Sequence, residues 1–516
     1  MAPKSLLGID VGGTAVKIGL FDLDGRLLGL HQEQIPILSP HPGWAEIDPA
    51  RWQAAVRVGV PHVLTQAKAS PDDIAALGLS NMIGTVVPVD RHGQPLRNAI
   101  AYFDTRSARQ AAWIVGQVPN IHQVSANRVT SGNTSLASIL WLRDHEPTIY
   151  AIAHRFLTTG SFLFRWLTGE TRIDWTTASF VGPFDYRAID WSVEVAERLG
   201  FDLARLPDVH APQSHAPLLP DVARELGLPR GVPVALGGID GAMSSVGVGA
   251  IHPGDAFDVS GTSEMIAVCL PQPVFSPELL ARWHVVPGVW VLIGAISTPG
   301  AALQWFRDQL YRASGKGGEG AHAAIDTDDL WEAMTREAAT SPPGANGVIF
   351  LPHMMGERAP IWDPDARGVF FGLTLGTTRG DMIRAIMEGA AYAMRHLIEL
   401  IEIRSGVPVR HAVTIGGAAR NPLWRQIKAD VWNVALSLPT VHEATVLGAA
   451  MTAGVAAGLY ADYGEAVRRA VPPPQETLIP DPARHRLYDR PYQIYRRLYP
   501  ALAEIMHLAA QGPSSA

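Results

Sequence analysis

The chain has 516 residues, more than one ordinary hydrophobic core requires, so two or three domains are expected. Its 47% hydrophobic and 18% charged residues are typical of a globular protein that buries large cores. A net charge of −7 without a basic run disfavours nucleic-acid partners, and a single cysteine excludes an internal disulfide framework. Because no apolar stretch suits a signal peptide or a membrane span, we expect a cytoplasmic protein without membrane partners.

The first predicted element is a β-hairpin at residues 6–20. Apolar residues alternate on both sides of the turn Gly12-Gly13-Thr14, and Lys17 follows on the second strand. Glycine turns expose consecutive backbone N–H groups with no Cβ in the way, which suits phosphate oxygens. Thr14 and Lys17 would add a hydroxyl and an ammonium donor. A single motif of this kind is more readily explained as an ordinary hairpin.

The segments that follow extend this sheet. Residues 26–30 predict a third antiparallel strand. Asp48 and Pro49 then open a helix that we expect to be interrupted near Pro61, and residues 75–80 predict a buried strand. A strand meander followed by alternating helix and strand implies a mixed sheet with helices on its faces.

The loop at residues 81–106 ends in a polar and aromatic segment that contains Tyr102, Asp104 and Arg106. Aromatic rings cover the C–H face of a polyol while charged groups bind its hydroxyls, so this segment suits a sugar. An exposed loop with a local ion pair explains the same residues.

A second cluster of motifs lies at mid-chain. Residues 233–239 predict a buried strand that ends at Asp240, where a helix of small residues begins, and this places Asp240 at the mouth of a cleft. A helix-capping aspartate is the ordinary alternative. A hairpin at 256–268 follows, and its turn, with Gly261 and Thr262, repeats the arrangement of the first hairpin. Two facing glycine turns would bind a polyphosphate, so the recurrence favours phosphate binding by both.

The remaining segments complete the second half. Residues 380–396 predict a long helix and residues 446–460 a buried one. Gly416 and Gly417 follow a strand and precede a helix, where glycines let a flat ligand or a phosphate approach the backbone. The glycine-rich run 315–320 lacks the spacing of a phosphate loop, and we expect a flexible surface loop there.

These motifs, in this order, resemble the FGGY carbohydrate kinases, which share a two-lobed actin-like ATPase fold of the ribonuclease H-like type with hexokinases and actin. The resemblance extends from Leu6 to about Tyr460 and is closest to the xylulokinase branch. Its most specific segments are Phe350-Leu351-Pro352, Gly356-Glu357-Arg358 and the run from Asp363 to Leu373. It implies an α/β protein with a mixed sheet and flanking helices in each lobe. Residues 1–249 would form the N-terminal lobe and residues 250–516 the C-terminal lobe.

The resemblance also implies roles for individual residues. Asp240 falls on the family's catalytic base, and Asp10 on an aspartate that helps to hold the Mg2+ of the nucleotide, so Asp10 and Asp240 are the expected metal ligands. The expected ATP- and phosphate-binding residues are Gly12, Gly13, Thr14, Lys17, Gly261, Thr262, Gly416, Gly417 and Asn421. The expected substrate-binding residues are Asn81, Met82, Ile83, Gly84, Tyr102, Asp104, Arg106 and Asp240. A homodimer is compatible with the resemblance.

The segments expected to bind the sugar depart from the xylulokinase pattern. Gly84 stands in place of a histidine that meets the sugar, and Gly241 replaces the asparagine that follows the base. We therefore expect a roomier pocket with fewer hydrogen bonds, which predicts a substrate bulkier than D-xylulose or poor selectivity among ketoses and polyols.

The predicted activity is ATP-dependent phosphorylation of a primary hydroxyl on a ketose or polyol, with other pentuloses, tetritols and pentitols as alternative acceptors. Two rival functions stay open on the sequence alone. One is a sugar-sensing regulator without turnover, which would be expected to carry a basic arm or a helix-turn-helix. The other is an actin-like ATPase that acts on protein partners.

Overall fold

The computed structural model describes residues 4–311, 327–441 and 443–510. The glycine-rich run 315–320 lies outside the described residues, so its prediction as a surface loop is not addressed. Among the residues that are described, no helix combines the length and the apolar character that crossing a membrane requires.

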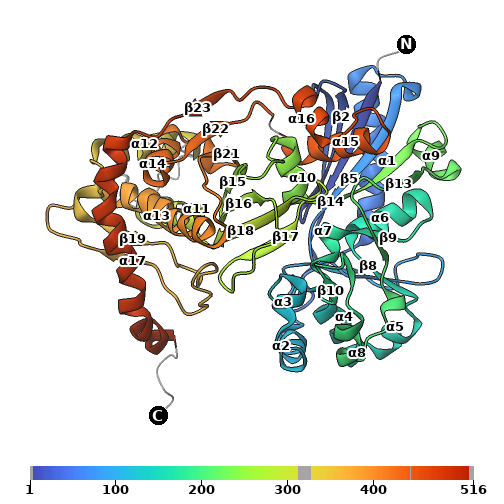
Figure 1. The fold of residues 1–516 in the computed structure, drawn as a ribbon, viewed down its shortest axis with the longest axis horizontal. Helices are drawn as coiled ribbons and strands as arrows, with labels where there is room; N and C mark the ends of the chain where they lie inside the picture. Colours follow the sequence, from blue (N-terminus) through green and yellow to red (C-terminus); the bar gives the residue numbers. More distant parts are fainter. Residues whose placement is uncertain (1–3, 312–326, 442, 511–516) are drawn as a thin grey trace, which may run out of the picture.

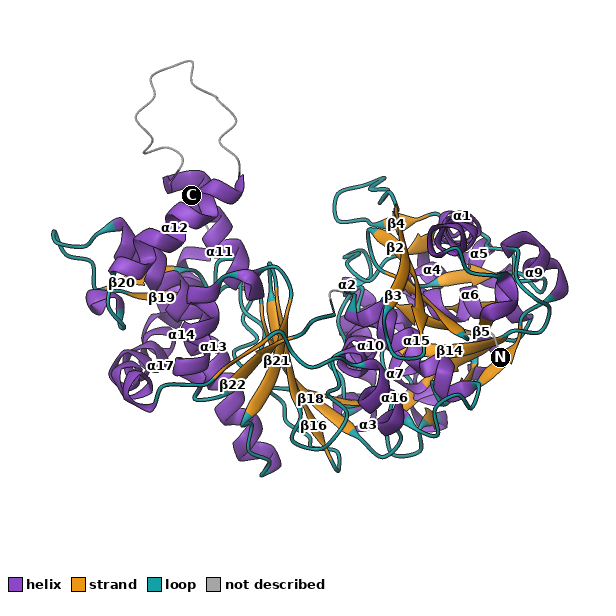
Figure 2. Ribbon diagram, turned by 90° about the horizontal axis from the view of Figure 1, so that it is seen from above, coloured by secondary structure: helices purple, strands orange, loops and turns teal. Residues whose placement is uncertain are grey.

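A mixed sheet of six strands forms the centre of the first lobe, with helices packed beside it (Figures 1 and 2). Its order is β13-β14-β5-β1-β2-β3, and β1, β2 and β3 form an antiparallel meander while β1, β5 and β14 are parallel. The strands are β1 (Ser5–Val11), β2 (Ala15–Asp22), β3 (Leu27–Gln34), β5 (Ile74–Asn81), β13 (His215–Pro217) and β14 (Pro233–Ile239).

A seven-stranded sheet at the centre of the second lobe repeats this topology. Its order is β17-β18-β16-β15-β21-β22-β23, with β15, β16 and β18 antiparallel and β15, β21 and β22 parallel. The strands are β15 (Ala256–Ser260), β16 (Glu264–Leu270), β17 (Leu280–Trp283), β18 (Trp290–Ile296), β21 (His411–Ile415), β22 (Ala435–Leu438) and β23 (Glu476–Leu478). Each sheet is a meander followed by two parallel strands, so the repeat predicted from the two glycine hairpins extends to whole sheets.

The described residues also form five two-stranded sheets outside the two central sheets. They are formed by β4 (Glu46–Ile47) with β7 (Ala99–Ile100), β6 (Val87–Val89) with β8 (Arg155–Leu157), β9 (Arg172–Asp174) with β12 (Asp208–His210), β10 (Phe184–Asp185) with β11 (Asp190–Trp191), and β19 (Ile349–Leu351) with β20 (Val369–Phe371).

The helices divide between the two halves of the chain. Those before residue 250 are α1 (Pro49–Ala67), α2 (Ala108–Gln117), α3 (Ile121–Ser125), α4 (Ser135–His145), α5 (Pro147–Ile152), α6 (Thr159–Thr168), α7 (Trp175–Ala178), α8 (Val193–Leu199), α9 (Pro220–Leu226) and α10 (Asp240–Gly247). Those after it are α11 (Pro299–Phe306), α12 (Thr327–Thr340), α13 (Arg379–Ser405), α14 (Pro422–Trp432), α15 (Ala444–Ala456), α16 (Tyr463–Ala470) and α17 (Pro482–Ala510).

Helix α1 runs through Pro61 without a break, so the predicted interruption is wrong. Asp48 caps the helix as expected, accepting a hydrogen bond from the Ala50 N–H at 3.0 Å. Proline removes one backbone hydrogen bond from a helix interior, but the apolar face on both sides of it is fully buried, including Trp52 and Val63. Burial of that face on the first sheet holds the helix together.

Helix α15 packs on the first lobe although it comes from the second half of the chain (Figure 1). The contact is so close that a Cβ on Gly8 of β1 would lie 2.1 Å from the Val446 carbonyl oxygen. A Cβ on Gly78 of β5 would lie 2.0 Å from that of Ala449. The predicted boundary at residue 249 therefore separates the two sheets, but not the helices that cover them.

Candidate active site

The two hairpin turns have matching geometry. The Gly12 N–H donates to the Ala15 carbonyl at 2.9 Å, and the Gly261 N–H donates to the Ser263 carbonyl at 2.9 Å. The threonine of each turn, Thr14 and Thr262, is exposed. Each turn therefore leaves a threonine hydroxyl accessible to a ligand, while the Gly12 and Gly261 N–H groups are used within the turns.

Asp240 is the first residue of α10 and follows directly on strand β14. One of its carboxylate oxygens accepts a hydrogen bond from the Gly241 N–H at 2.6 Å. The residue is accessible at the surface of a cavity, yet protein atoms surround it closely. Desolvation raises the pKa of the Asp240 carboxyl, and the backbone hydrogen bond and the Arg282 guanidinium act in the opposite direction. A carboxyl with a raised pKa in a cavity is suited to proton transfer.

Asp10 lies near enough to Asp240 for their charges to interact. Burial, and then the charge of Asp240, raises the pKa of the Asp10 carboxyl to about 7, against the hydrogen bond that it accepts from the Ser80 hydroxyl at 2.7 Å. A divalent cation would relieve this repulsion by favouring both ionised forms, so the pair fits a magnesium site. Among the described residues no group of three or more His, Cys, Asp or Glu could hold a metal ion. Mg2+ commonly binds through one or two carboxylates, with water and phosphates completing its shell.

A cavity of about 290 Å³ lies between the two lobes beside Asp240. Its walls carry the rings of Tyr102, Phe180, Trp283 and Trp362 and the side chains of Arg128, Arg282 and Arg358. Asp240 is the single carboxylate among the described residues that line it. Aromatic walls with a few polar groups suit a polyhydroxylated ligand.

Three of the predicted substrate residues, Ile83, Tyr102 and Asp240, line this cavity. Two others, Asn81 and Met82, are buried and do not line the cavity. The Asn81 side-chain amide donates to the Gly238 carbonyl at 2.9 Å and so ties β5 to β14, while Met82 is 1% exposed in the core of the first lobe.

The two glycines that depart from the xylulokinase pattern differ in their surroundings. Gly84 has a φ of 64°, and a Cβ there would lie 2.5 Å from the Gly132 carbonyl oxygen. Backbone packing therefore explains this glycine, and it does not enlarge the pocket. Gly241 lines the cavity, and the nearest atom to a Cβ there would be the Met265 methyl at 3.8 Å, so this glycine does leave room.

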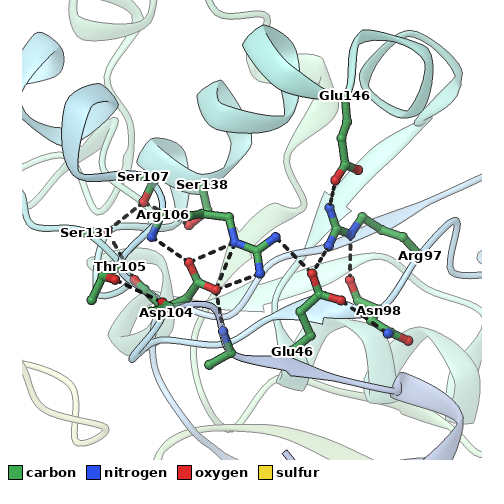
Figure 3. Close-up of polar contacts among 12 residues, drawn as sticks. Glu46, Arg97, Asn98, Asp104, Thr105, Arg106, Ser107, Ser131, Ser138 and Glu146 are labelled. Atoms are coloured by element: carbon green, nitrogen blue, oxygen red, sulfur yellow. Dashed lines mark hydrogen bonds and ion pairs between the residues drawn. The ribbon is translucent and has the colours of Figure 1, made fainter. Parts of the chain in front are cut away.

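Asp104 and Arg106 form a buried ion pair (Figure 3). Asp104 also accepts from the Ala45 N–H at 2.6 Å, and Arg106 reaches Glu46 at 2.9 Å while stacking 3.6 Å above the Trp44 ring. Their side chains are 0% and 1% exposed, and neither lines the cavity. The expected local ion pair exists, but it fixes the loop that carries Tyr102, and direct substrate binding by either residue stays a prediction.

The Asp104–Arg106 pair belongs to a longer chain of charges. Glu46 also pairs with Arg97, and Arg97 pairs with Glu146 on the far side (Figure 3). The Asn98 amide donates to Glu46 at 3.3 Å. This network joins β4 to the loop that carries Tyr102, a residue of the cavity wall.

The predicted nucleotide residues of the second lobe lie beside its hairpin. Gly416 has a φ of 100°, and a Cβ there would lie 2.3 Å from the Ser260 carbonyl oxygen, whereas a Cβ on Gly417 would meet nothing within 4 Å. Asn421 caps α14 by accepting from the Trp424 N–H at 3.1 Å, and its amide donates to Thr335 at 2.8 Å. Gly417 is the residue of this group with open space beside it.

Two ion pairs within the chain, one at Lys17 and one below the second hairpin turn, were not predicted from the sequence. Lys17 pairs with Glu443 at 2.7 Å. Below the second turn, buried Lys428 pairs with Glu264 and donates to Ser260 at 2.5 Å. Burial raises the pKa of the Glu264 carboxyl to about 8 against the opposing effect of Lys428.

The three cavity-lining arginines, and the rings of the cavity wall other than Tyr102, were also missed by sequence reasoning. Arg282 was the one with a readable signal, because it is the single charge in the short apolar strand β17. A charged residue in such a strand is either paired or functional.

Comparisons with known proteins match these features. Residues 5–247 match the N-terminal domain, and residues 257–457 the C-terminal domain, of the FGGY family of carbohydrate kinases. The chain is 28% identical to a xylulose kinase of Staphylococcus epidermidis, over 97% of both chains, and 30% identical to the gluconokinase of Bacillus subtilis, over 88% of this chain and 87% of that one. The crystal structure of xylulose kinase from Rhodospirillum rubrum aligns with a TM-score of 0.89 at 27% identity, over 98% of this chain and 100% of that chain. The predicted two-lobed actin-like fold is thereby confirmed.

Proposed function

The chain belongs to the FGGY family of carbohydrate kinases, enzymes that phosphorylate sugars, and we propose that it transfers the γ-phosphoryl group of ATP to a hydroxyl of a ketose or polyol. The observation that carries this proposal is the position of Asp240. Asp240 is the single carboxylate among the described residues that line the cavity. Its charge also acts on Asp10, which belongs to β1, the strand that leads into the first hairpin turn.

In the proposed reaction the acceptor hydroxyl gives its proton to Asp240 as its oxygen attacks the γ-phosphorus. A new P–O bond forms, the bond to the bridging oxygen breaks, and ADP leaves. With Mg2+ bound, the Asp240 carboxyl would be ionised and so able to accept this proton. The turns that contain Thr14 and Thr262 would donate hydrogen bonds to the phosphates, and their fixed position favours the charge that develops there.

Asp10 and Asp240 would hold the Mg2+ of the nucleotide. When bound, this ion neutralises charge on the phosphate oxygens. The residues of the chain itself position the acceptor and exclude water, because the cavity walls come from both lobes.

The acceptor is proposed from the cavity and from the relatives together. Those relatives include a protein named xylulose kinase and one named gluconokinase. Space beside Gly241 would admit pentuloses, tetritols, pentitols and larger homologues. We place the reaction in the cytoplasm, where ATP is supplied, and assign Asp104 and Arg106 the indirect role of fixing the loop that carries Tyr102.

The test is ADP release by the purified protein with ATP and Mg2+, measured with and without a panel of ketoses, polyols and sugar acids. Acceptor-dependent release is expected for the wild type, and Asp240→Asn should abolish it. A protein that hydrolyses ATP at the same rate whatever acceptor is present would not be a sugar kinase.

A further inference from the structure

Arg282 lies in the cavity with a hydrogen-bonding capacity that the protein leaves unused. It is 8% exposed, and its guanidinium stacks 3.6 Å above the ring of Phe180. Its Nη1 atom is buried, and none of the described residues accepts a hydrogen bond from it. Burying a charged donor without an acceptor is unfavourable, so a ligand that offers an acceptor there is bound favourably.

The other two arginines of the cavity wall already have partners. Arg128 donates to the Pro277 carbonyl at 2.9 Å and lies near Glu278. Arg358 donates to the Ile296 carbonyl at 2.7 Å and lies near Glu357. The one carboxylate whose charge acts on Arg282 is Asp240, the proposed base.

Of the three guanidinium groups on the cavity wall, Arg282 is therefore the one that keeps a buried N–H donor without an acceptor among the described residues. The unpartnered guanidinium fits an anion, and its planar fork matches the two oxygens of a carboxylate. The glycines and threonines of the two hairpin turns do not line this cavity. An anion at this position could be a group on the acceptor or the phosphoryl group transferred beside Asp240, and acceptors with and without a carboxylate distinguish the two.

We propose that Arg282 binds a carboxylate on the acceptor, so that the substrate is a sugar acid whose hydroxyl end faces Asp240. This proposal rests on the proposed kinase function and narrows its substrate class. A neutral ketose or alditol would leave the guanidinium unpaired, and a site with an unpaired buried donor discriminates against such analogues.

The experiment compares acceptors matched in length and differing in the terminal group: xylonate against xylitol, and gluconate against glucitol, with D-xylulose as a neutral ketose. For the wild type we expect kcat/KM to favour the acids by about 100-fold. Arg282→Gln should remove that preference by lowering kcat/KM for the acids about 100-fold, with changes of about threefold or less for the neutral acceptors. Arg282→Lys keeps the charge without the fork and should restore part of the preference. Arg57→Gln, at an exposed arginine of α1, controls for loss of a positive charge elsewhere.

Two outcomes would overturn the proposal. A wild-type enzyme that turns over neutral acceptors and not the acids would exclude the carboxylate, whether or not the variants fold. An Arg282→Gln variant whose kcat falls equally for acids and neutral acceptors would show that Arg282 acts on the transferred phosphoryl group or on Asp240. If no acceptor of either class promotes ADP release, the kinase function itself fails, which separates the two proposals.

Discussion

Lys17 on β2 pairs with Glu443, 426 residues later and directly before α15, at 2.7 Å between Nζ and Oε2. The pair fastens the strand after the first glycine turn to the helix that covers the first sheet. Its side chains are 31% and 20% exposed, so its contribution to stability is small. The lysine that resembles a phosphate ligand thus has a carboxylate partner of its own.

Because Lys17 pairs with Glu443, its contribution to stability can be measured separately from any role in phosphate binding. We expect Lys17→Met and Glu443→Gln each to lower the free energy of unfolding by about 1 kcal/mol, with a double variant that is less than additive. If Lys17 also binds phosphate, Lys17→Met alone should weaken ATP binding in calorimetry. Equal ATP affinities in the two single variants would leave Lys17 with the structural role only.

The Asp10 carboxyl predicts a pH dependence of stability. Its pKa is raised in the folded protein to about 7, so the folded state binds its proton more tightly than the unfolded state. Stability from this group is present below the ordinary aspartate pKa of 3.8 and is lost as the pH rises through about 7. Asp10→Asn should therefore be more stable than the wild type at pH 8, by on the order of 4 kcal/mol.

Urea unfolding of both proteins at pH 4 and pH 8 measures this difference, with the pH 4 values as the internal reference. Mg2+ and ATP should stabilise the wild type at pH 8 and have less effect on the variant. A variant that follows the same pH profile as the wild type would show that Asp10 is not the group responsible.

Because Asp104 and Arg106 form a buried ion pair, replacing Asp104 should lower the stability of the protein as well as any binding of the substrate. Asp104→Ala leaves Arg106 buried beside Glu46 without its closest partner, and we expect a loss of about 3 kcal/mol. Thermal and chemical unfolding provide the measurement. Arg106→Met on the same background should recover part of the loss, because it removes the buried charge that has lost Asp104 as a partner. Unchanged stability together with a large rise in KM would instead favour direct substrate contact by Asp104.

Substitutions at Gly84 and Gly241, the two glycines that differ from the xylulokinase pattern, should have different effects on stability. Gly84→Ala forces a side chain into a positive φ and against the Gly132 carbonyl, so a loss of about 2 kcal/mol or more is expected. Gly241→Ala has space and lies in the first turn of α10, so stability should change by less than about 1 kcal/mol. Its kcat/KM should fall most for the bulkiest acceptors. Loss of folding in Gly241→Ala would contradict the open space described beside it.

Substitutions in the turn of the second hairpin should weaken ATP binding without unfolding the protein. A Cβ on Gly261 would lie 3.7 Å from its nearest neighbour, the Ser263 carbonyl oxygen, so Gly261→Val leaves the turn intact while covering its N–H groups. We expect ATP to bind about 10-fold or more weakly, and Thr262→Val to weaken it by a smaller factor through the lost hydroxyl. Thr14→Val is the matched change in the first hairpin. Calorimetry that found unchanged ATP affinity in all three variants would remove both turns from the phosphate site.

The local motifs were predictable from the sequence because their partners are close in the chain. The hairpin turns, Asp240 at the start of α10 and the strand before Gly416 are each set by alternation and glycine placement over a dozen residues or so. Lys428 could not be read in this way, since Asp258 and Glu264 lie more than 160 residues before it and reach it only through packing of α14 on the sheet. The same holds for Arg282, whose unused donor depends on which side chains surround it in space.

The packing of α15 on the first sheet has a consequence for how the protein is made. The residues that cover β1 and β5 lie at 444–456, so the apolar surface around Leu6 and Ala76 has no cover until almost the whole chain has been synthesised. Exposed apolar strands in incomplete chains associate with one another. A fragment that ends at residue 249 would contain all six strands of the first sheet but lack α15, so we expect it not to fold stably by itself.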